Sequence, residues 1–345
     1  MTTPTTLTVL AFTALVTTGA QAQTLTISNW DGYLAPDAIA NFTKDTGNAA
    51  ELVLHATNEE IMGKLIASGG AGYDVVFVSS PFAEILNKMG LAEKLDPAKI
   101  PNMANLYPEA TKLAHDPGNT FSVPYTWGTT GLCYRSDLMA APTSWNDLLA
   151  PKPELVGKTT MLATDRWLLA AGFLANGMSV NDTNEADLTV VRDALIAAKK
   201  TLLAYDDTTF YAKLVSGEAV MTQAWDGWCN YGITDNPAIK YVIPSEGSDL
   251  WVDTMVIMTG SKNKDAAYAF VNYILDGKQH RWAAENILYK VPNKAAMDGL
   301  SPELLTQYPN MAMTPAELLT HEQLRDVGEA QRAYSRAVTE IMASQ

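Results

Sequence analysis

Tryptophan and aspartate lie within two residues of one another in three distant segments of this 345-residue chain. The pairs are Trp30 and Asp31 in SNWDGY, Trp225 and Asp226 in QAWDGW, and Trp251 and Asp253 in DLWVDTM. The face of an indole ring attracts a cation, and a nearby carboxylate supplies the opposite charge. If folding brings the three segments together, they predict a pocket for a small, positively charged molecule. The alternative is that each Trp is a core residue and each Asp a solvated turn residue.

The composition indicates a globular protein and argues against nucleic-acid binding. Hydrophobic residues make up 47% of the chain and charged residues 18%, and its length is enough for two domains of ordinary size. The formal net charge is −14, whereas a protein that neutralises phosphates needs a basic surface. We therefore expect no nucleic-acid partner.

No residue pattern typical of catalysis, metal binding or cofactor binding occurs in the sequence. GxSxG, HExxH, P-loop and GxGxxG motifs are all missing, and the four histidines are scattered. We therefore expect no catalytic residues, no metal site and no cofactor. The main rival is a secreted carbohydrate-active enzyme, in which Asp31, Asp226 and Asp253 would be the catalytic carboxylates and Trp rings would stack on sugars. A sugar receptor is a further alternative.

Residues 1–22 have the features of a secretory signal peptide. They contain the apolar run TLTVLAFTALV and end in Ala20-Gln21-Ala22, a small-residue cleavage pattern. We therefore expect an exported protein whose mature chain begins after Ala22. In an oxidising compartment Cys133 and Cys229 can form a disulfide. The sequence equally allows two separately buried thiols.

Strand and helix patterns alternate through the first part of the mature chain. Strand patterns occupy 25–30, 50–57 and 73–80, and helical patterns occupy 36–47, 58–70 and 81–90. Asn58 is the expected cap of the second helix. This βαβαβ order predicts an open α/β sheet that binds ligands at the carboxyl ends of its strands, near Trp30, Asn58 and Ser79. The β-rich run 121–137 predicts a strand that crosses into a second domain, since no Pro/Gly linker is visible.

The order and spacing of these segments resemble the periplasmic solute-binding proteins of spermidine/putrescine ABC transporters. The similarity covers nearly all of the mature sequence, and it is carried by SNWDGYLAPDAIANFTKDTG, YDVVFVSS, VPYTWGTTGL, QAWDGW, IPSEGSDLWVDTM, NKDAAYAFVNYIL, YKVPNKAA and DVGEA. It implies the α/β fold of a two-lobed periplasmic-binding-protein clamshell (type II-like), with an open α/β sheet in each lobe and crossover strands between them. The implied domains are a signal peptide at 1–22, a first lobe at 23–125 plus 252–305, and a second lobe at 126–251 plus 306–345.

The resemblance also implies a ligand site in which aromatic rings enclose a methylene chain and carboxylates hold ammonium groups. Carried over by position, the ligand-binding residues are Trp30, Asp31, Tyr33, Ser79, Trp167, Trp225, Asp226, Trp251, Asp253 and Tyr289, with Trp228 nearby. Asp253 is the implied principal carboxylate, Trp251 a stacking ring and Tyr289 a rim residue. The implied partners are a small cationic organic ligand and the membrane permease of an ABC importer, with the receptor a periplasmic monomer.

Two positions depart from the family pattern. Trp167 stands where the family usually has a glutamate, with Arg166 beside it, and Leu324 stands where a polar residue precedes DVG, one step after Gln323. Both changes weaken recognition of a second ammonium group, and an indole suits a quaternary or single amine. Arg166 would suit a ligand carboxylate if it faced the cleft. The expected ligand is a polyamine or a related monoamine or zwitterion, with a quaternary amine or a short ω-amino acid as the alternative.

Overall fold

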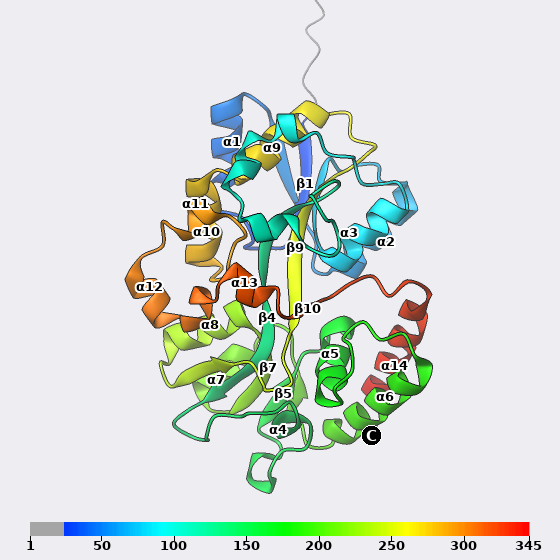
Figure 1. The fold of residues 1–345 in the computed structure, drawn as a ribbon, viewed down its shortest axis with the longest axis vertical. Helices are drawn as coiled ribbons and strands as arrows, with labels where there is room; N and C mark the ends of the chain where they lie inside the picture. The colour runs from blue at the N-terminus through cyan, green and yellow to red at the C-terminus, as the bar shows by residue number, and fades with distance from the viewer. Residues whose placement is uncertain (1–23, 345) are drawn as a thin grey trace, which may run out of the picture.

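A computed structural model describes residues 24–344, so the predicted signal peptide lies outside the described residues. Two lobes lie one above the other, and two long strands run from one lobe into the other (Figure 1). These strands are β4 (Val123–Arg135) and β9 (Asp249–Ile257). No helix within residues 24–344 is both long enough and apolar enough to cross a membrane.

The first lobe is built on the predicted βαβαβ unit. Its strands β1 (Leu25–Asn29), β2 (Ala50–Leu54) and β3 (Val75–Ser79) pair in parallel in the order β2-β1-β3. The helices of this half are α1 (Ala38–Thr46), α2 (Asn58–Ser68), α3 (Ser80–Lys88), α9 (Lys264–Ile274), α10 (Gly277–Asn286) and α11 (Lys294–Met297). The apolar run VVFVS of β3 is buried throughout, as a strand covered on both faces must be.

The second lobe continues the same sheet. Its strands are β5 (Thr159–Met161), β6 (Ala204–Tyr205), β7 (Met221–Trp225) and β8 (Ile239–Val242). Its helices are α4 (Asn146–Leu149), α5 (Asp165–Ala175), α6 (Glu185–Lys199), α7 (Phe210–Ser216), α8 (Asp226–Asp235) and α14 (Gln331–Ala343). Between the lobes lie α12 (Pro302–Gln307), α13 (Pro315–Leu318) and β10 (Glu322–Gln323). Short 3-10 turns occupy Pro97–Lys99, Pro101–Asn105, Pro108–Thr111, Pro153–Leu155, Pro309–Ala312 and Gly328–Ala330.

The sheet has ten strands: eight follow the order β2-β1-β3-β9-β4-β7-β5-β6, and off this path β8 pairs with β4 and β10 pairs with β9. β9 lies antiparallel between β3 and β4, so strands far apart in the sequence meet where the two lobes join. Two of the predicted lobe boundaries, after Tyr125 and after Trp251, fall within β4 and β9. A third, after Leu305, falls within α12. These limits remain predictions.

A disulfide joins Cys133 on β4 to Cys229 on α8, with their Cα atoms 5.8 Å apart. The sequence left this pairing open. The bond closes a loop between residues 96 apart in the sequence. In the chain-entropy description, closing a loop of this length stabilises the fold by roughly 4–5 kcal/mol. The bond therefore ties the crossover strand firmly to the second lobe.

Candidate functional site

Asp253 lies on β9 where this strand passes between the lobes, and its side chain is buried. Its neighbours in the sheet are Ser79 on β3 and Thr126 on β4. The Ser79 hydroxyl donates to Oδ1 at 2.6 Å, and the Tyr33 hydroxyl donates to Oδ2 at 2.7 Å. Burial raises the pKa of Asp253, and the hydrogen bonds from Ser79, Tyr33 and Thr126 oppose that rise. Among residues 24–344 no Lys or Arg pairs with this carboxylate, so its hydrogen-bonded oxygens lack a counter-charge.

A helix N-terminus positions Ser79. Asn58 in the first turn of α2 accepts from the Ser79 backbone N–H at 2.9 Å and donates to the Ser79 hydroxyl at 3.1 Å. The prediction that Asn58 caps α2 is wrong, because Thr57 is the cap and its hydroxyl accepts from the Glu60 N–H. The Asn58 side chain faces the end of β3 instead. It thereby fixes the hydroxyl that reaches Asp253.

Four aromatic rings contact one another beside Asp253. The ring centroids of Trp30 and Tyr33 are 5.3 Å apart, those of Tyr33 and Tyr289 are 6.2 Å apart, and those of Tyr289 and Trp251 are 4.6 Å apart. Each pair meets edge to face, an arrangement that aromatic side chains prefer. Desolvation and the nearby Asp253 raise the pKa of Tyr33 well above its ordinary value, so the phenol stays protonated as a donor.

Two glycines make room for these rings. A Cβ atom at Gly128 would collide with the Trp251 ring and with the carboxylate of Asp226. A Cβ atom at Gly227 would collide with the ring of Tyr289. The glycines in YTWGTT and WDGW are therefore needed for close packing, which is a signal that the sequence analysis did not use.

Asp226 pairs with Lys290, a residue that the sequence analysis missed. Both side chains are 1% exposed, and the Lys290 ammonium contacts Asp226 Oδ2. The backbone N–H groups of Gly227 and Thr129 also donate to the Asp226 carboxylate, at 2.9 and 3.3 Å. The chain itself thus supplies the counter-charge of Asp226, and only the negative charge of Asp253 remains for a ligand among these two acids.

The other predicted residues lie in three different surroundings. Trp167 and Trp225 meet edge to face with centroids 5.6 Å apart, and Trp225 is the sheet partner of Thr130 on β4. Trp228 instead packs in a separate aromatic cluster with Phe210, Tyr211 and Tyr231. Asp31 is exposed, and none of the hydrogen bonds described for this site involves it. The structure therefore groups Asp253 with Trp30, Tyr33, Ser79, Trp251 and Tyr289, places Trp167 and Trp225 in a pair of their own, and leaves Asp31 exposed.

Arg166, Gln323 and Leu324, which lie at the two departures from the family pattern, contact other parts of the chain. The Arg166 guanidinium donates to the carbonyls of Arg325 and Val180 and to the side-chain oxygen of Asn181, which ties α5 to neighbouring loops. Gln323 donates to the ring of His115 and accepts from the Ala114 N–H. Leu324 is fully buried. Both terminal nitrogens of Arg166 thus have neutral acceptors within the chain, while its Nε has no partner among the described residues.

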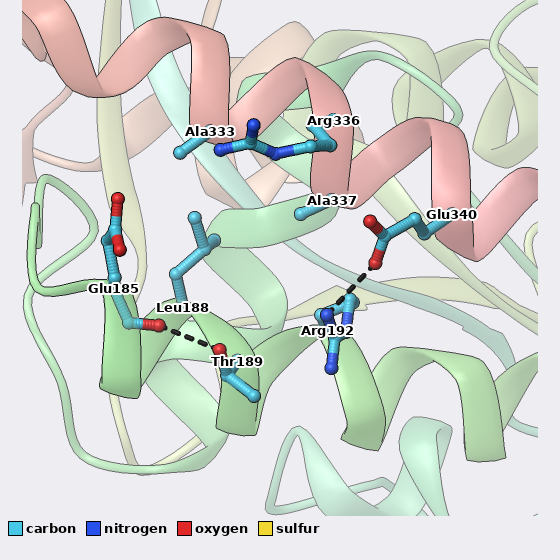
Figure 2. Close-up of a pocket in the computed structure, with 8 residues that line it drawn as sticks. All are labelled: Glu185, Leu188, Thr189, Arg192, Ala333, Arg336, Ala337 and Glu340. Carbon is cyan, nitrogen blue, oxygen red and sulfur yellow. Dashed lines mark hydrogen bonds and ion pairs between the residues drawn. The ribbon is translucent and has the colours of Figure 1, made fainter.

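A surface hollow between α6 and α14 lies apart from this site (Figure 2). It is lined by Glu185, Leu188, Thr189, Arg192, Ala333, Arg336, Ala337 and Glu340. Arg192 pairs with Glu340 across it at 2.9 Å, and both side chains are substantially exposed. A solvated, internally paired surface of this kind contributes little binding energy.

Comparison with known proteins extends the likeness over both lobes. A family model described as bacterial extracellular solute-binding protein matches residues 37–313. The spermidine/putrescine-binding periplasmic protein of Salmonella typhimurium is 31% identical over 327 residues, covering 93% of this chain and 92% of the relative. A putrescine-binding periplasmic protein of Escherichia coli is 32% identical over 313 residues, covering 84% of this chain and 83% of the relative.

A solved structure described as a putative spermidine/putrescine ABC transporter from Listeria monocytogenes superposes with a TM-score of 0.85 at 30% identity. The superposition covers 93% of this chain and 99% of that chain. The predicted resemblance and the predicted two-lobed α/β fold are thereby confirmed.

Proposed function

Because this chain belongs to the bacterial extracellular solute-binding proteins, we propose that it captures a polyamine outside the cytoplasmic membrane and delivers it to the permease of an ABC importer. Putrescine and spermidine are the proposed ligands, because relatives that cover more than four-fifths of the chain carry those names. The lobes at 23–125 plus 252–305 and at 126–251 plus 306–345 would close around the ligand by a hinge motion at β4 and β9. We further propose that the receptor is a monomer in the periplasm and that residues 1–22 direct its export.

The observation that carries this proposal is the buried Asp253 carboxylate beside the rings of Trp30, Trp251 and Tyr289. A buried anion is costly without a counter-charge. An alkylammonium ion supplies that charge, and its methylene chain replaces water on the ring faces. A neutral sugar would supply no counter-charge for Asp253.

The size of the expected binding energy is compatible with a transport receptor. Micromolar to nanomolar affinity corresponds to about 8–12 kcal/mol. Each contact between a cation and an aromatic face contributes roughly 0.5–2 kcal/mol, and the ion pair with Asp253 adds to these contacts. Closure of the two lobes would remove water from the pair and strengthen it.

The alternatives have less support from the side chains. A short ω-amino acid needs a free cationic group for its carboxylate, whereas Lys290 is paired with Asp226 and the terminal nitrogens of Arg166 are hydrogen-bonded to neutral oxygens of the chain. A carbohydrate-active enzyme needs two free carboxyl groups flanking a sugar. Asp226 is paired with Lys290 and Asp31 is exposed, so only Asp253 of the three candidates is buried without a counter-charge.

Titration calorimetry of the mature protein tests the function. We expect putrescine or spermidine to bind with micromolar or tighter affinity, with a change in Trp fluorescence and no chemical conversion of the ligand. A panel of choline, betaine, a short ω-amino acid and a neutral oligosaccharide should bind at least ~100-fold more weakly, because none presents two ammonium groups on an aliphatic chain. A neutral sugar that binds more tightly than every amine would contradict the proposal.

Replacing Trp251 tests the stacking role against a matched tryptophan in the core. We expect Trp251→Leu to weaken putrescine binding roughly 5- to 30-fold, equivalent to the loss of one cation–ring contact. Trp145 is fully buried in the second lobe, where its Nε1 donates to the Gly247 carbonyl. Trp145→Leu should lower the free energy of unfolding by roughly 3 kcal/mol while changing affinity less than ~3-fold. Equal losses of affinity in the two variants would remove Trp251 from the site.

A further inference from the structure

We propose that Asp249 is a second cation-binding residue of the cleft, which holds the far ammonium group of a ligand anchored at Asp253. This inference rests on the proposed function and specifies its ligand as an aliphatic amine with at least two charged nitrogens. Asp249 is not among the residues that the Trp/Asp pairs or the family resemblance pointed to.

The first argument is the alternation of side chains along β9. Successive residues of a strand point to opposite faces, so Asp249, Trp251 and Asp253 share one face. The pairing of β9 with β4 is regular from Trp127 to Thr129, so no bulge in that stretch changes the alternation. An acid therefore precedes and follows Trp251 on the face of β9 that carries Asp253.

The second argument is that Asp249 is buried without a partner. The residue is 1% exposed, and in the described part of the chain no donor reaches its Oδ2 and no Lys or Arg pairs with it. Burial raises its pKa to about 7, and the nearby Thr130 hydroxyl and Arg166 guanidinium only partly oppose this rise. Such a carboxyl group is stabilised in its ionised form when a cation arrives.

The surroundings of Asp249 also supply an acceptor and an aromatic wall. The Thr130 hydroxyl is buried beside Asp249, and its oxygen can accept a hydrogen bond from an ammonium group. Trp225 is the sheet partner of Thr130, so its ring lies on the same face as Asp249, and Trp167 packs against that ring. An ammonium group at Asp249 would thus meet a carboxylate, a hydroxyl and ring surfaces.

Asp226 cannot take this role, because the Lys290 ammonium already occupies its carboxylate. Asp226 and Asp249 therefore differ: Asp226 forms an ion pair with Lys290, whereas Asp249 has the Arg166 guanidinium nearby but forms no ion pair with it. This contrast assigns the second charge of the ligand to Asp249.

The spacing suits a short polyamine. Asp249 and Asp253 are four residue steps apart along the strand, which is about 13 Å between Cα atoms. An ammonium nitrogen lies about 2.8 Å from the carboxylate it pairs with. A diamine lying along β9 would place its methylene chain across the Trp251 ring, with one ammonium toward each acid. A monoamine would reach Asp253 alone.

The test compares a diamine with a monoamine of the same chain length in Asp249→Asn. We expect putrescine affinity to fall roughly 10- to 100-fold, as for loss of a hydrogen bond to a charged group, while butylamine affinity changes less than ~3-fold. Asp249→Ser repeats the measurement in case the amide is not accommodated. Asp235→Asn is the matched control, since Asp235 is exposed at the end of α8.

The outcomes separate this inference from the proposed function. A collapse of the putrescine-to-butylamine affinity ratio in both Asp249 variants supports the inference. An unchanged ratio, or an equal loss for both amines, overturns it while leaving the proposed function in place. If the unmodified protein binds neither putrescine nor spermidine, the proposed function fails and the role of Asp249 fails with it.

Discussion

Asp253→Asn should weaken putrescine binding roughly 30- to 1000-fold, the range expected when one partner of a buried, hydrogen-bonded charge pair is removed. The amide keeps the shape of the side chain and an oxygen that accepts from Ser79 or Tyr33. It removes the negative charge that faces the ligand. Both putrescine and butylamine should be affected, because both place an ammonium group at this position.

The fold should tolerate this change. Burial raises the pKa of Asp253, which means that the ionised carboxylate destabilises the unliganded protein at neutral pH. We therefore expect the denaturation midpoint of the variant without ligand to be equal to or above that of the original protein. Calorimetry that finds an unchanged putrescine affinity in the folded variant would exclude Asp253 as the anchoring acid.

Lys290→Met should lower the free energy of unfolding by roughly 3–5 kcal/mol, because it leaves the Asp226 carboxylate buried without a counter-charge. Both groups are 1% exposed, so water cannot replace the ammonium. Denaturant titration followed by circular dichroism measures the loss.

A double variant separates the ion pair from simple packing. Lys290→Met combined with Asp226→Asn removes both charges and keeps an oxygen for the N–H groups of Gly227 and Thr129. We expect it to recover most of the stability lost in Lys290→Met, with a coupling energy of about 2 kcal/mol or more. Strictly additive losses would show that the two residues act independently.

The sequence pattern was sufficient to predict the βαβαβ unit of the first lobe and Asp253 as the acid that anchors the ligand. The buried run of β3 and the alternation of strands and helices predicted the βαβαβ unit, whose strand end carries Ser79. The Trp/Asp spacing and the family resemblance predicted that Trp30, Trp251 and Asp253 lie near one another. These signals are local or belong to long motifs, so one chain was enough to detect them.

The partner of Asp226 could not be predicted in this way. Lys290 is 64 residues away in the sequence, and a single lysine has no spacing that indicates which acid it will meet. The pairing of Cys133 with Cys229 was undetermined for the same reason, since two cysteines show that a bond is possible and not that it forms.

Asp249 could have been identified as a candidate site residue from the sequence alone. The segment DLWVD has an acid two residues before and two residues after the tryptophan, which in a strand places all three on one face. Only Asp253 was paired with Trp251 on spacing, and the family resemblance pointed to the same acid.

The position of β9 in the chain has a consequence for how this protein reaches its native state. β9 forms the junction between β3 and β4, yet it is synthesised after all four strands β5–β8 of the other lobe. The amino-terminal half therefore cannot complete its sheet while it emerges from the ribosome. Its assembly depends on contacts between residues far apart in sequence, which makes folding slow and leaves the edge of β3 open until late.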